Sequence, residues 1–224
     1  IEQTICPPSK HKPLKQSRTT GRKLKQKLIS DPEIYISADQ TTKAIKQSKN
    51  SKALGHDGIS PVMLKHMGPS GIAFLTKIFN QVINTAIIPS NWKTGRIIPI
   101  LKPGKPADEG KSYRPITLLS PAIKILERII LPDIAAAVPL AEHQHGFRKG
   151  HSTITAVNEI TNHISIGLNK KKPVDRTVLV ALDLTAAFDT VSHEILLLDI
   201  QDLQLNSRYK KFLASYLNGH QVYT

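Results

Sequence analysis

The sequence contains very little cysteine and lacks long hydrophobic runs. Cys6 is the single cysteine among 224 residues, which excludes an internal disulfide and favours a reducing, intracellular compartment. No apolar run approaches the roughly 18 residues that a membrane-spanning helix needs, and the first residues lack the pattern of a secretory signal peptide. Both absences argue against a membrane protein, and a hydrophobic content of 40% is typical of a soluble globular chain.

Acidic residues are scarce relative to basic ones. The chain has 31 lysines and arginines against 17 aspartates and glutamates, which gives a formal net charge of +14. Such an excess favours a polyanionic partner, because each Lys or Arg that neutralises a phosphate releases condensed counterions. A charged surface that merely keeps the protein soluble is the alternative explanation from composition alone.

Much of the positive charge lies near the start of the chain. Residues 10–27 contain eight lysines and arginines and no acid. Few residues in this region could build a core, so we interpret residues 1–30 as a flexible basic arm or linker.

Helices and strands alternate through the rest of the chain, which predicts a mixed α/β (α+β) fold. Helical spacing over residues 60–86 predicts a buried stripe of Met63, Phe74, Leu75, Ile78, Phe79, Val82 and Ile83. The other expected elements are a helix from Ser37 or Asp39 to about Asn50, a turn at 55–58, strands at about 94–101 and 114–119, a helix from Pro121 that Pro132 kinks or interrupts, a helix from Ser152–Thr153 to about Gly167, a turn over 169–176, and final helices at about 193–204 and 207–218.

The stretch "RTVLVALDLTAAFDTVSHE", residues 176–194, carries two carboxylates. Its apolar run predicts a strand covered on both faces that ends at Asp183, and ligand sites favour such strand ends. A turn-capping role for Asp183 is the structural alternative. If the strand continues, Asp189 lies about 20 Å from Asp183. If a helix begins at Leu184, Asp189 lies about 120° from Asp183 around the helix axis. Asp189 is therefore expected to act locally and not to share a metal ion with Asp183.

Four blocks of the sequence, in order, resemble one protein family. They are "NSKALGHDGISPVMLKHM", "WKTGRIIPILKPGKPADEGKSYRPITLLSPAIKILERII", "EHQHGFRKGHSTITAV" and "LVALDLTAAFDTVSH". Together they resemble the reverse transcriptases of non-LTR (LINE-type) retrotransposons. The resemblance implies a right-hand polymerase fold, with fingers over residues 31–120 and the start of the palm over residues 121–224.

This resemblance implies a two-metal Mg²⁺ mechanism. Asp183 would ligate a metal ion that bridges to the incoming nucleotide, and the carbonyl of Leu184 would help to hold the second ion. Phe188 falls at the family's steric-gate position, where a ring would exclude the ribose 2′-hydroxyl; plain core packing is the alternative for Phe188.

Several cations receive roles from the same resemblance. Lys102 and Arg114 are expected to reach the triphosphate, and Lys105 is a credible substitute for Lys102. Arg148 and Lys149, in the "QxGFR" block and just after it, are expected to contact the template backbone. A zinc site formed by His143, His145 and His151 is disfavoured, because the only cysteine is distant and no paired ligand set accompanies these histidines.

The family's later motifs, including the aromatic-x-Asp-Asp hairpin, do not occur in the chain. We therefore expect a piece of a longer protein, inactive alone, that carries one of the three acids the chemistry needs. RNA template, DNA primer or target and deoxynucleoside triphosphates are the implied partners, and cytoplasm and nucleus the implied locations. A decayed or repurposed copy that binds nucleic acid without catalysis is the alternative function.

Overall fold

The computed structural model describes residues 31–171, 176–184 and 186–224. The chain divides into two compact units. Among the described residues, one unit comprises 31–137 and 197–224, and the other comprises 138–196. The predicted basic arm at residues 1–30 and the middle of the predicted turn at 169–176 lie outside the described residues.

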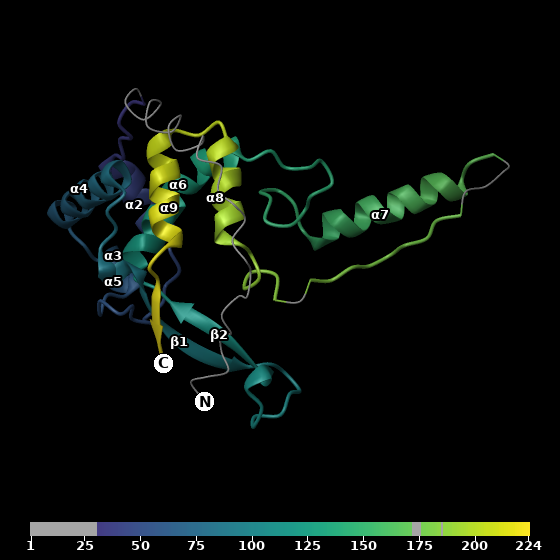
Figure 1. Cartoon of the computed structure of the whole chain (residues 1–224), viewed down its shortest axis with the longest axis horizontal. Helices are drawn as coiled ribbons and strands as arrows, with labels where there is room; N and C mark the ends of the chain where they lie inside the picture. Colours follow the sequence, from purple (N-terminus) through teal and green to yellow (C-terminus); the bar gives the residue numbers. More distant parts are fainter. Residues whose placement is uncertain (1–30, 172–175, 185) are drawn as a thin grey trace, which may run out of the picture. The chain divides into compact units, whose positions relative to one another are not determined.

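The described residues form helices and a small mixed sheet (Figure 1). The first unit contains α2 (Ala38–Gln47), α3 (Pro61–Lys65), α4 (Pro69–Thr85), α5 (Ser90–Lys93), β1 (Thr94–Leu101), the 3₁₀ turn η1 (Gly110–Ser112), β2 (Tyr113–Leu118), α6 (Pro121–Ala137), α9 (Ser207–Leu217) and β3 (Gln221–Tyr223). The second contains α7 (Thr153–Leu168), and α8 (His193–Asp202) crosses the boundary between the units. The predicted mixed α/β class is confirmed.

Helices α2, α4, α6 and α9 enclose the core of the first unit. Their buried side chains include Ile45, Phe79, Ile83, Leu126 and Phe212, each at most 3% exposed. In α4 the buried positions Leu75, Phe79, Val82 and Ile83 follow helical spacing, as predicted. The prediction was wrong for Met63 and Phe74, which are 59% and 67% exposed. A break after α3 separates Met63 from α4, and Phe74 lies beside the buried stripe.

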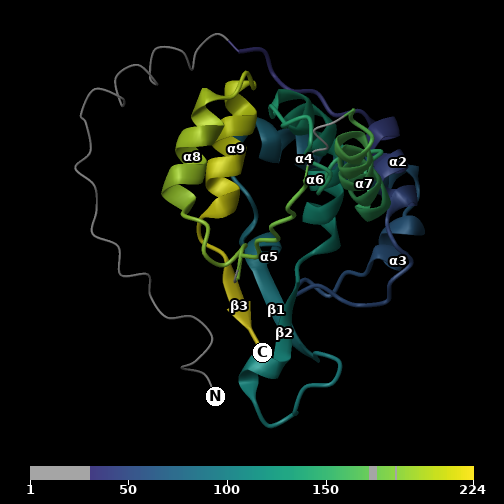
Figure 2. The same cartoon turned by 90° about the vertical axis from the view of Figure 1, so that its right-hand side faces the viewer.

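The predicted strands at about 94–101 and 114–119 are confirmed as an antiparallel pair, with Ile98 opposite Ile116. The sequence did not predict β3, which pairs in parallel with the first residues of β1 and gives the sheet order β2-β1-β3 (Figure 2). Three residues without a periodic pattern give too weak a signal for strand prediction.

The predicted helix boundaries at Ser37 and Ser152 are confirmed. Each of these serines accepts a hydrogen bond from the backbone N–H three residues ahead and forms a capping box. Pro132 lies inside α6, and the helix continues past it to Ala137, so the predicted interruption does not occur. Residues 55–58 form the expected turn, and Gly58 has a φ of +71°.

The predicted strand ending at Asp183 is absent. Residues 176–184 belong to no strand, and Val178, Leu179, Val180 and Leu182 are between 67% and 92% exposed. The described residues of the second unit contain no strand, so this apolar run has no ladder partner there. A strand needs such a partner for its backbone hydrogen bonds.

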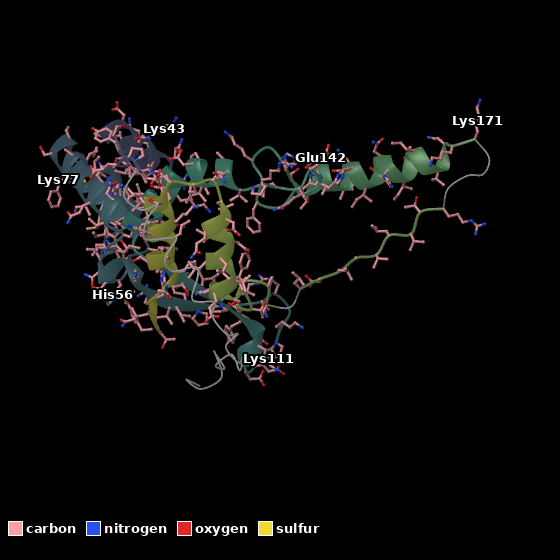
Figure 3. The ribbon with its side chains drawn as sticks, turned by 45° about the horizontal axis from the view of Figure 1, so that its top comes forward. Lys43, His56, Lys77, Lys111, Glu142 and Lys171 are labelled. Atoms are coloured by element: carbon pink, nitrogen blue, oxygen red, sulfur yellow. The ribbon has the colours of Figure 1, made fainter. Side chains whose placement is uncertain are left out.

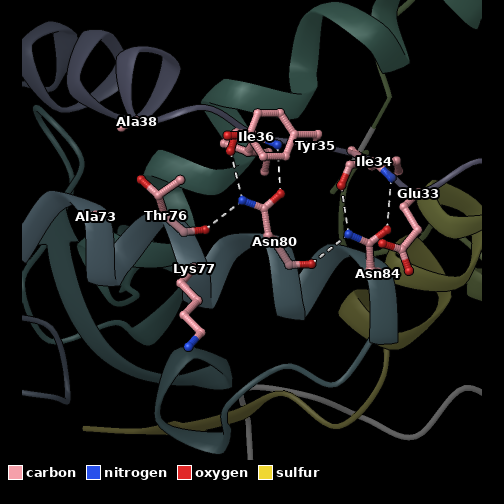
Figure 4. Close-up of a pocket in the computed structure, with 10 residues that line it drawn as sticks. All are labelled: Glu33, Ile34, Tyr35, Ile36, Ala38, Ala73, Thr76, Lys77, Asn80 and Asn84. Carbon is pink, nitrogen blue, oxygen red and sulfur yellow. Dashed lines mark hydrogen bonds between the residues drawn. The ribbon is translucent and has the colours of Figure 1, made fainter.

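Two asparagines of α4 bind the backbone of the segment that precedes α2 (Figure 4). The Asn80 amide accepts from the Ile36 N–H (2.7 Å) and donates to the Ile36 carbonyl (2.8 Å). The Asn84 amide makes the same pair of bonds with Ile34, at 3.0 and 2.7 Å. Four residues of helix advance about 6 Å and two extended residues about 6.6 Å, so the two periods match. We call this arrangement the asparagine ladder.

Asn80→Ala is expected to lower the free energy of unfolding by about 1–3 kcal/mol, because the Ile36 peptide loses both partners in a largely buried setting. Chemical denaturation of the whole chain measures the change. The matched control is Asn91→Ala in α5, where the side chain is exposed and a change within about 0.5 kcal/mol is expected. Equal effects of the two substitutions would contradict a stabilising role for the ladder.

Candidate nucleotide and metal site

The predicted triphosphate-binding cations Lys102 and Arg114 lie on one face of the β1–β2 hairpin. Arg114 stands opposite Ile100 in the register, and the Lys102 N–H donates to the Ser112 carbonyl (2.8 Å), which extends the ladder past β1. Alternate residues of a strand share a face, and so do residues that stand opposite each other on neighbouring strands. Lys102, Ile100 and Arg114 therefore lie on the same side of the hairpin.

The side chains of these cations differ in their contacts. Lys102 Nζ donates to the Lys111 carbonyl across the connecting loop (2.8 Å). Arg114 is exposed on β2, and Lys105 is exposed in the loop, where its N–H donates to the Lys102 carbonyl. Lys102 thus braces the loop between the strands, while the charges of Arg114 and Lys105 face solvent.

Asp183 lies in the exposed apolar segment of the second unit. One of its carboxylate oxygens accepts from the N–H of the next residue, Leu184 (2.9 Å), so this contact is local. Residues 186–190 form a turn, in which the Asp189 N–H donates to the Ala186 carbonyl (3.0 Å). The described residues between Asp183 and Asp189, which are 184 and 186–188, belong to no strand or helix, so neither geometry expected for Asp189 occurs.

The described ranges, 31–171, 176–184 and 186–224, contain no group of three His, Cys, Asp or Glu residues that could hold a metal ion. Asp183 and the carbonyl of Leu184 offer hard oxygen donors, the type that Mg²⁺ prefers. The donor chemistry of these two residues therefore fits one part of a magnesium site.

Phe188 is exposed and contacts a second aromatic ring. Its ring meets that of Phe147 edge to face, with centroids 6.0 Å apart. Phe188 is 79% exposed and Phe147 is 96% exposed, so the core-packing alternative for Phe188 does not hold in this structure. Phe147 also has a φ of +57°, which is uncommon for a bulky side chain. Phe147 belongs to the "QxGFR" block, and its positive φ could not be read from the sequence.

Arg148 and Lys149 lie in the loop before α7. One guanidinium nitrogen of Arg148 donates to the carbonyls of Ala141 (3.1 Å) and Glu142 (2.9 Å), which closes the loop on itself. Lys149 is exposed. Arg148 therefore stabilises the loop with one nitrogen and has further N–H donors for other contacts.

His143 and His145 contact the Glu159 carboxylate of α7, which no sequence pattern had indicated. His143 Nδ1 contacts one oxygen of Glu159, and His145 Nε2 lies 2.5 Å from the other. The hydrogen bonds from His145 and His143 hold the pKa of the Glu159 carboxyl below its usual value. His145 Nδ1 also lies 2.9 Å from Thr155 Oγ1. These contacts fasten the loop to α7 within the second unit.

Glu159→Gln is expected to destabilise the second unit at neutral pH and to have little effect in acid. A depressed carboxyl pKa contributes stability above the unfolded-state value of about 4.3, and this contribution is lost as pH falls through the folded-state pKa. Thermal unfolding of the wild-type and variant chains, compared between neutral and acidic pH, measures the difference. Glu142→Gln in the same loop is the control, and a pH-independent Glu159→Gln effect would refute the prediction.

The structure groups the predicted residues in two places. Lys102, Lys105 and Arg114 lie in the first unit, and Asp183, Leu184, Phe188, Arg148 and Lys149 lie in the second. Each group is formed by its own unit.

Comparison with known proteins identifies the class of the chain. Residues 100–224 match the family model described as reverse transcriptase (RNA-dependent DNA polymerase). This match covers more than half of the chain and includes both groups of predicted residues. The chain therefore belongs to the reverse transcriptase family, and the family predicted from the sequence blocks is confirmed.

Similar proteins come from insect mobile elements. The probable RNA-directed DNA polymerase from transposon X-element of Drosophila melanogaster is 35% identical over 96% of this chain, and that from transposon BS of the same species is 36% identical over 86%. The RNA-directed DNA polymerase from mobile element jockey of Drosophila funebris is 30% identical over 87%. The chain spans 24%, 21% and 21% of the lengths of these relatives, respectively. No helix among the described residues is long and apolar enough to cross a membrane.

Proposed function

We propose that this chain is part of the RNA-directed DNA polymerase of a non-LTR retrotransposon. The observation that carries the proposal is the family match over residues 100–224, together with relatives named as RNA-directed DNA polymerases. The substrates would be an RNA template, a DNA primer or target, and deoxynucleoside triphosphates. The protein would act in the cytoplasm and the nucleus, where these substrates occur.

In this proposal residues 31–120 belong to the fingers, and residues 121–224 begin the palm. Lys102 and Arg114 bind the triphosphate from the shared face of the hairpin, with Lys105 beside them. The planar guanidinium of Arg114 suits bidentate phosphate contacts, and Lys102 acts as a point charge. Arg148 and Lys149 contact the template backbone.

Asp183, with the carbonyl of Leu184, would hold Mg²⁺ in this polymerase. Magnesium held there would supply a lower pKa at the attacking hydroxyl and charge stabilisation at the transferred phosphate. The role of the Asp183 carboxylate is to supply a fixed negative charge and an oxygen donor at the end of the apolar segment. The Asp183 side chain is exposed, so its carboxylate is accessible to a metal ion.

RNA-templated primer extension tests the function. The assay uses a polypeptide that contains this chain and extends over the full length of its relatives. It is supplied with an RNA template, a DNA primer and Mg²⁺. Extension with deoxynucleoside triphosphates that stops on chelation of the metal is the expected result. A folded, RNA-binding protein that does not extend the primer would overturn the proposal and favour a nucleic-acid-binding remnant.

Phe188→Ala is expected to weaken discrimination against ribonucleotides by about 10- to 100-fold, because the ring would no longer exclude the 2′-hydroxyl. The ratio of kcat/KM for a deoxynucleotide to that for the matching ribonucleotide measures the effect in the same primer-extension assay. Phe188→Tyr keeps the ring and serves as the control. An unchanged ratio in the Ala variant would remove Phe188 from the sugar site.

A further inference from the structure

A second basic site lies in the first unit, in a groove of about 310 Å³ between the segment at residues 48–54 and the start of α6. Three of the residues that line this groove are cations: Lys49, Lys124 and Arg128. All three side chains are exposed. None of the described residues that line the groove is acidic. We call this feature the α6 groove.

Helix α6 contributes two of these cations as a stripe. Lys124 and Arg128 are four residues apart, so they lie on the same face, about 6 Å from each other along the axis. Pro121 and Ile125 line the groove from the same helix. The acid nearest to Arg128 in the sequence, Glu127, accepts a hydrogen bond from the Tyr216 hydroxyl of α9 instead. The charged residues that α6 presents to the groove, Lys124 and Arg128, are therefore both basic.

The opposite wall contributes Lys49, two hydroxyl groups and an apolar side chain. Ser48 and Ser51 line this wall together with Leu54, which is 48% exposed. The turn that follows is held close to the start of α6, because the Asp57 carboxylate accepts from the buried Ser120 hydroxyl (2.5 Å). This bond occupies the one acid of the turn, and Asp57 does not line the groove.

The cations of the α6 groove contact no counter-charge among the described residues. Within the part of the chain that the structure describes, Lys49, Lys124 and Arg128 form no ion pair and no side-chain hydrogen bond. Three uncompensated cations in one concave site create a positive potential that attracts anions. A bound anion would thus supply the missing partners.

The chemistry of the lining favours a phosphodiester chain over a nucleoside triphosphate. A triphosphate binds with Mg²⁺, which proteins hold through carboxylates, and the groove has none. A phosphodiester strand instead presents one charge per nucleotide, which matches cations spread along two walls. Leu54, Leu118 and Pro121 offer apolar surface for sugars and base faces. The described lining contains no amide side chain of the kind that reads adenine and no carboxylate of the kind that reads cytosine.

We propose that the α6 groove binds the sugar–phosphate backbone of a nucleic-acid strand without sequence preference. Lys49, Lys124 and Arg128 contact successive phosphates, and Ser48 and Ser51 add hydroxyl contacts. The site is separate from the Lys102 and Arg114 face and from Asp183. It does not depend on the proposed polymerase chemistry, because binding is measured without nucleotide incorporation.

The test compares the 224-residue chain with a triple variant, Lys49→Gln, Lys124→Gln and Arg128→Gln. Fluorescence anisotropy of a labelled single-stranded RNA of mixed sequence gives the affinity over a range of salt concentrations. The plot of log affinity against log salt is expected to lose about 2 units of slope, since each lost contact to a single strand removes about 0.7. The affinity at low salt is expected to fall by about 10- to 100-fold.

The matched control removes the same charge outside the groove, in the variant Lys43→Gln, Lys77→Gln and Lys211→Gln. These three lysines are exposed on α2, α4 and α9, and Figure 3 labels two of them, Lys43 and Lys77. The control is expected to change the slope by less than about 1 unit. Circular dichroism and thermal unfolding verify that both variants fold like the wild-type chain.

Two results would overturn the proposal. Equal losses of RNA affinity in the groove and control variants would show that binding depends only on the total charge of the chain. A groove variant that loses affinity for a deoxynucleoside triphosphate but keeps its affinity for RNA would assign the groove to nucleotide binding. Failure of the polymerase assay alone leaves this binding result unaffected, so the two hypotheses fail separately.

Discussion

Asp183→Asn should reduce RNA-templated primer extension by at least about 100-fold in a protein that contains this chain and extends over the full length of its relatives. The substitution replaces a charged oxygen donor by a neutral amide of nearly the same shape. Loss of a metal ligand removes several kcal/mol of transition-state stabilisation, and each 1.36 kcal/mol corresponds to a factor of ten in rate. Single-turnover extension from a fixed primer–template isolates the chemical step.

Asp189→Asn provides the matched control, because this carboxylate lies six residues away in the same segment. Its backbone N–H belongs to the turn at 186–190, so activity within a few-fold of wild type is expected. RNA affinity should be unchanged in both variants. Equal extension by the wild-type and Asp183→Asn proteins would exclude the metal role and leave nucleic-acid binding as the function of the chain.

Phe79→Ala should have the largest effect on stability, a loss of about 3–5 kcal/mol in the free energy of unfolding. Phe79 is fully buried in α4, and its ring packs edge to face against Trp92 with centroids 5.9 Å apart. Truncation leaves a cavity at the centre of the first unit. Trp92 is the only tryptophan of the chain, so its fluorescence during urea denaturation follows the unfolding of this unit directly.

Phe74→Ala makes the same chemical change on the same helix at an exposed position. A change within about 0.5 kcal/mol is expected there, as for surface substitutions in general. Both substitutions replace phenylalanine by the better helix former alanine, so their effects on helix propensity are the same. The difference between the Phe79→Ala and Phe74→Ala variants therefore measures the effect of burial. A large decrease in the free energy of unfolding of the Phe74→Ala variant would mean that the Phe74 side chain is covered in solution.

The parts of the fold that were predictable depend on local signals. Capping residues at Ser37 and Ser152 and apolar spacing in α4 identify helices, because their hydrogen bonds and burial involve residues within a few positions of one another. The β1–β2 pair was predictable for the same reason, since a short Pro/Gly-rich loop joins its strands. The pairing of β3 with β1 joins residues more than 120 positions apart, and no local pattern encodes it.

The candidate site also combines residues that local sequence patterns identify with residues that only the fold brings together. Lys102 and Arg114 were identified because their blocks resemble a family, and the hairpin register then placed them on one face. Asp183 was indicated by the apolar run before it as well as by the resemblance. Lys49, Lys124 and Arg128 were not identified, because each looks like an ordinary surface cation in the sequence. Only the packing of residues 48–54 near α6 brings them into one groove. The strand predicted before Asp183 failed because apolar, β-prone residues do not form a strand without a ladder partner.

The discontinuity of the first unit has a consequence for the order of events during synthesis. Its core includes Tyr209 and Phe212 of α9 as well as residues of α2, α4 and α6. A ribosome that has completed α6 must add the 75 residues from Val138 to Phe212 before that core can close, which takes roughly 4 to 15 s at about 5 to 20 residues per second. During this interval the nascent chain exposes the apolar faces of three helices. The asparagine ladder needs only residues 34–84, so it can form early and align α4 with the segment before α2 while the last helix is still being made.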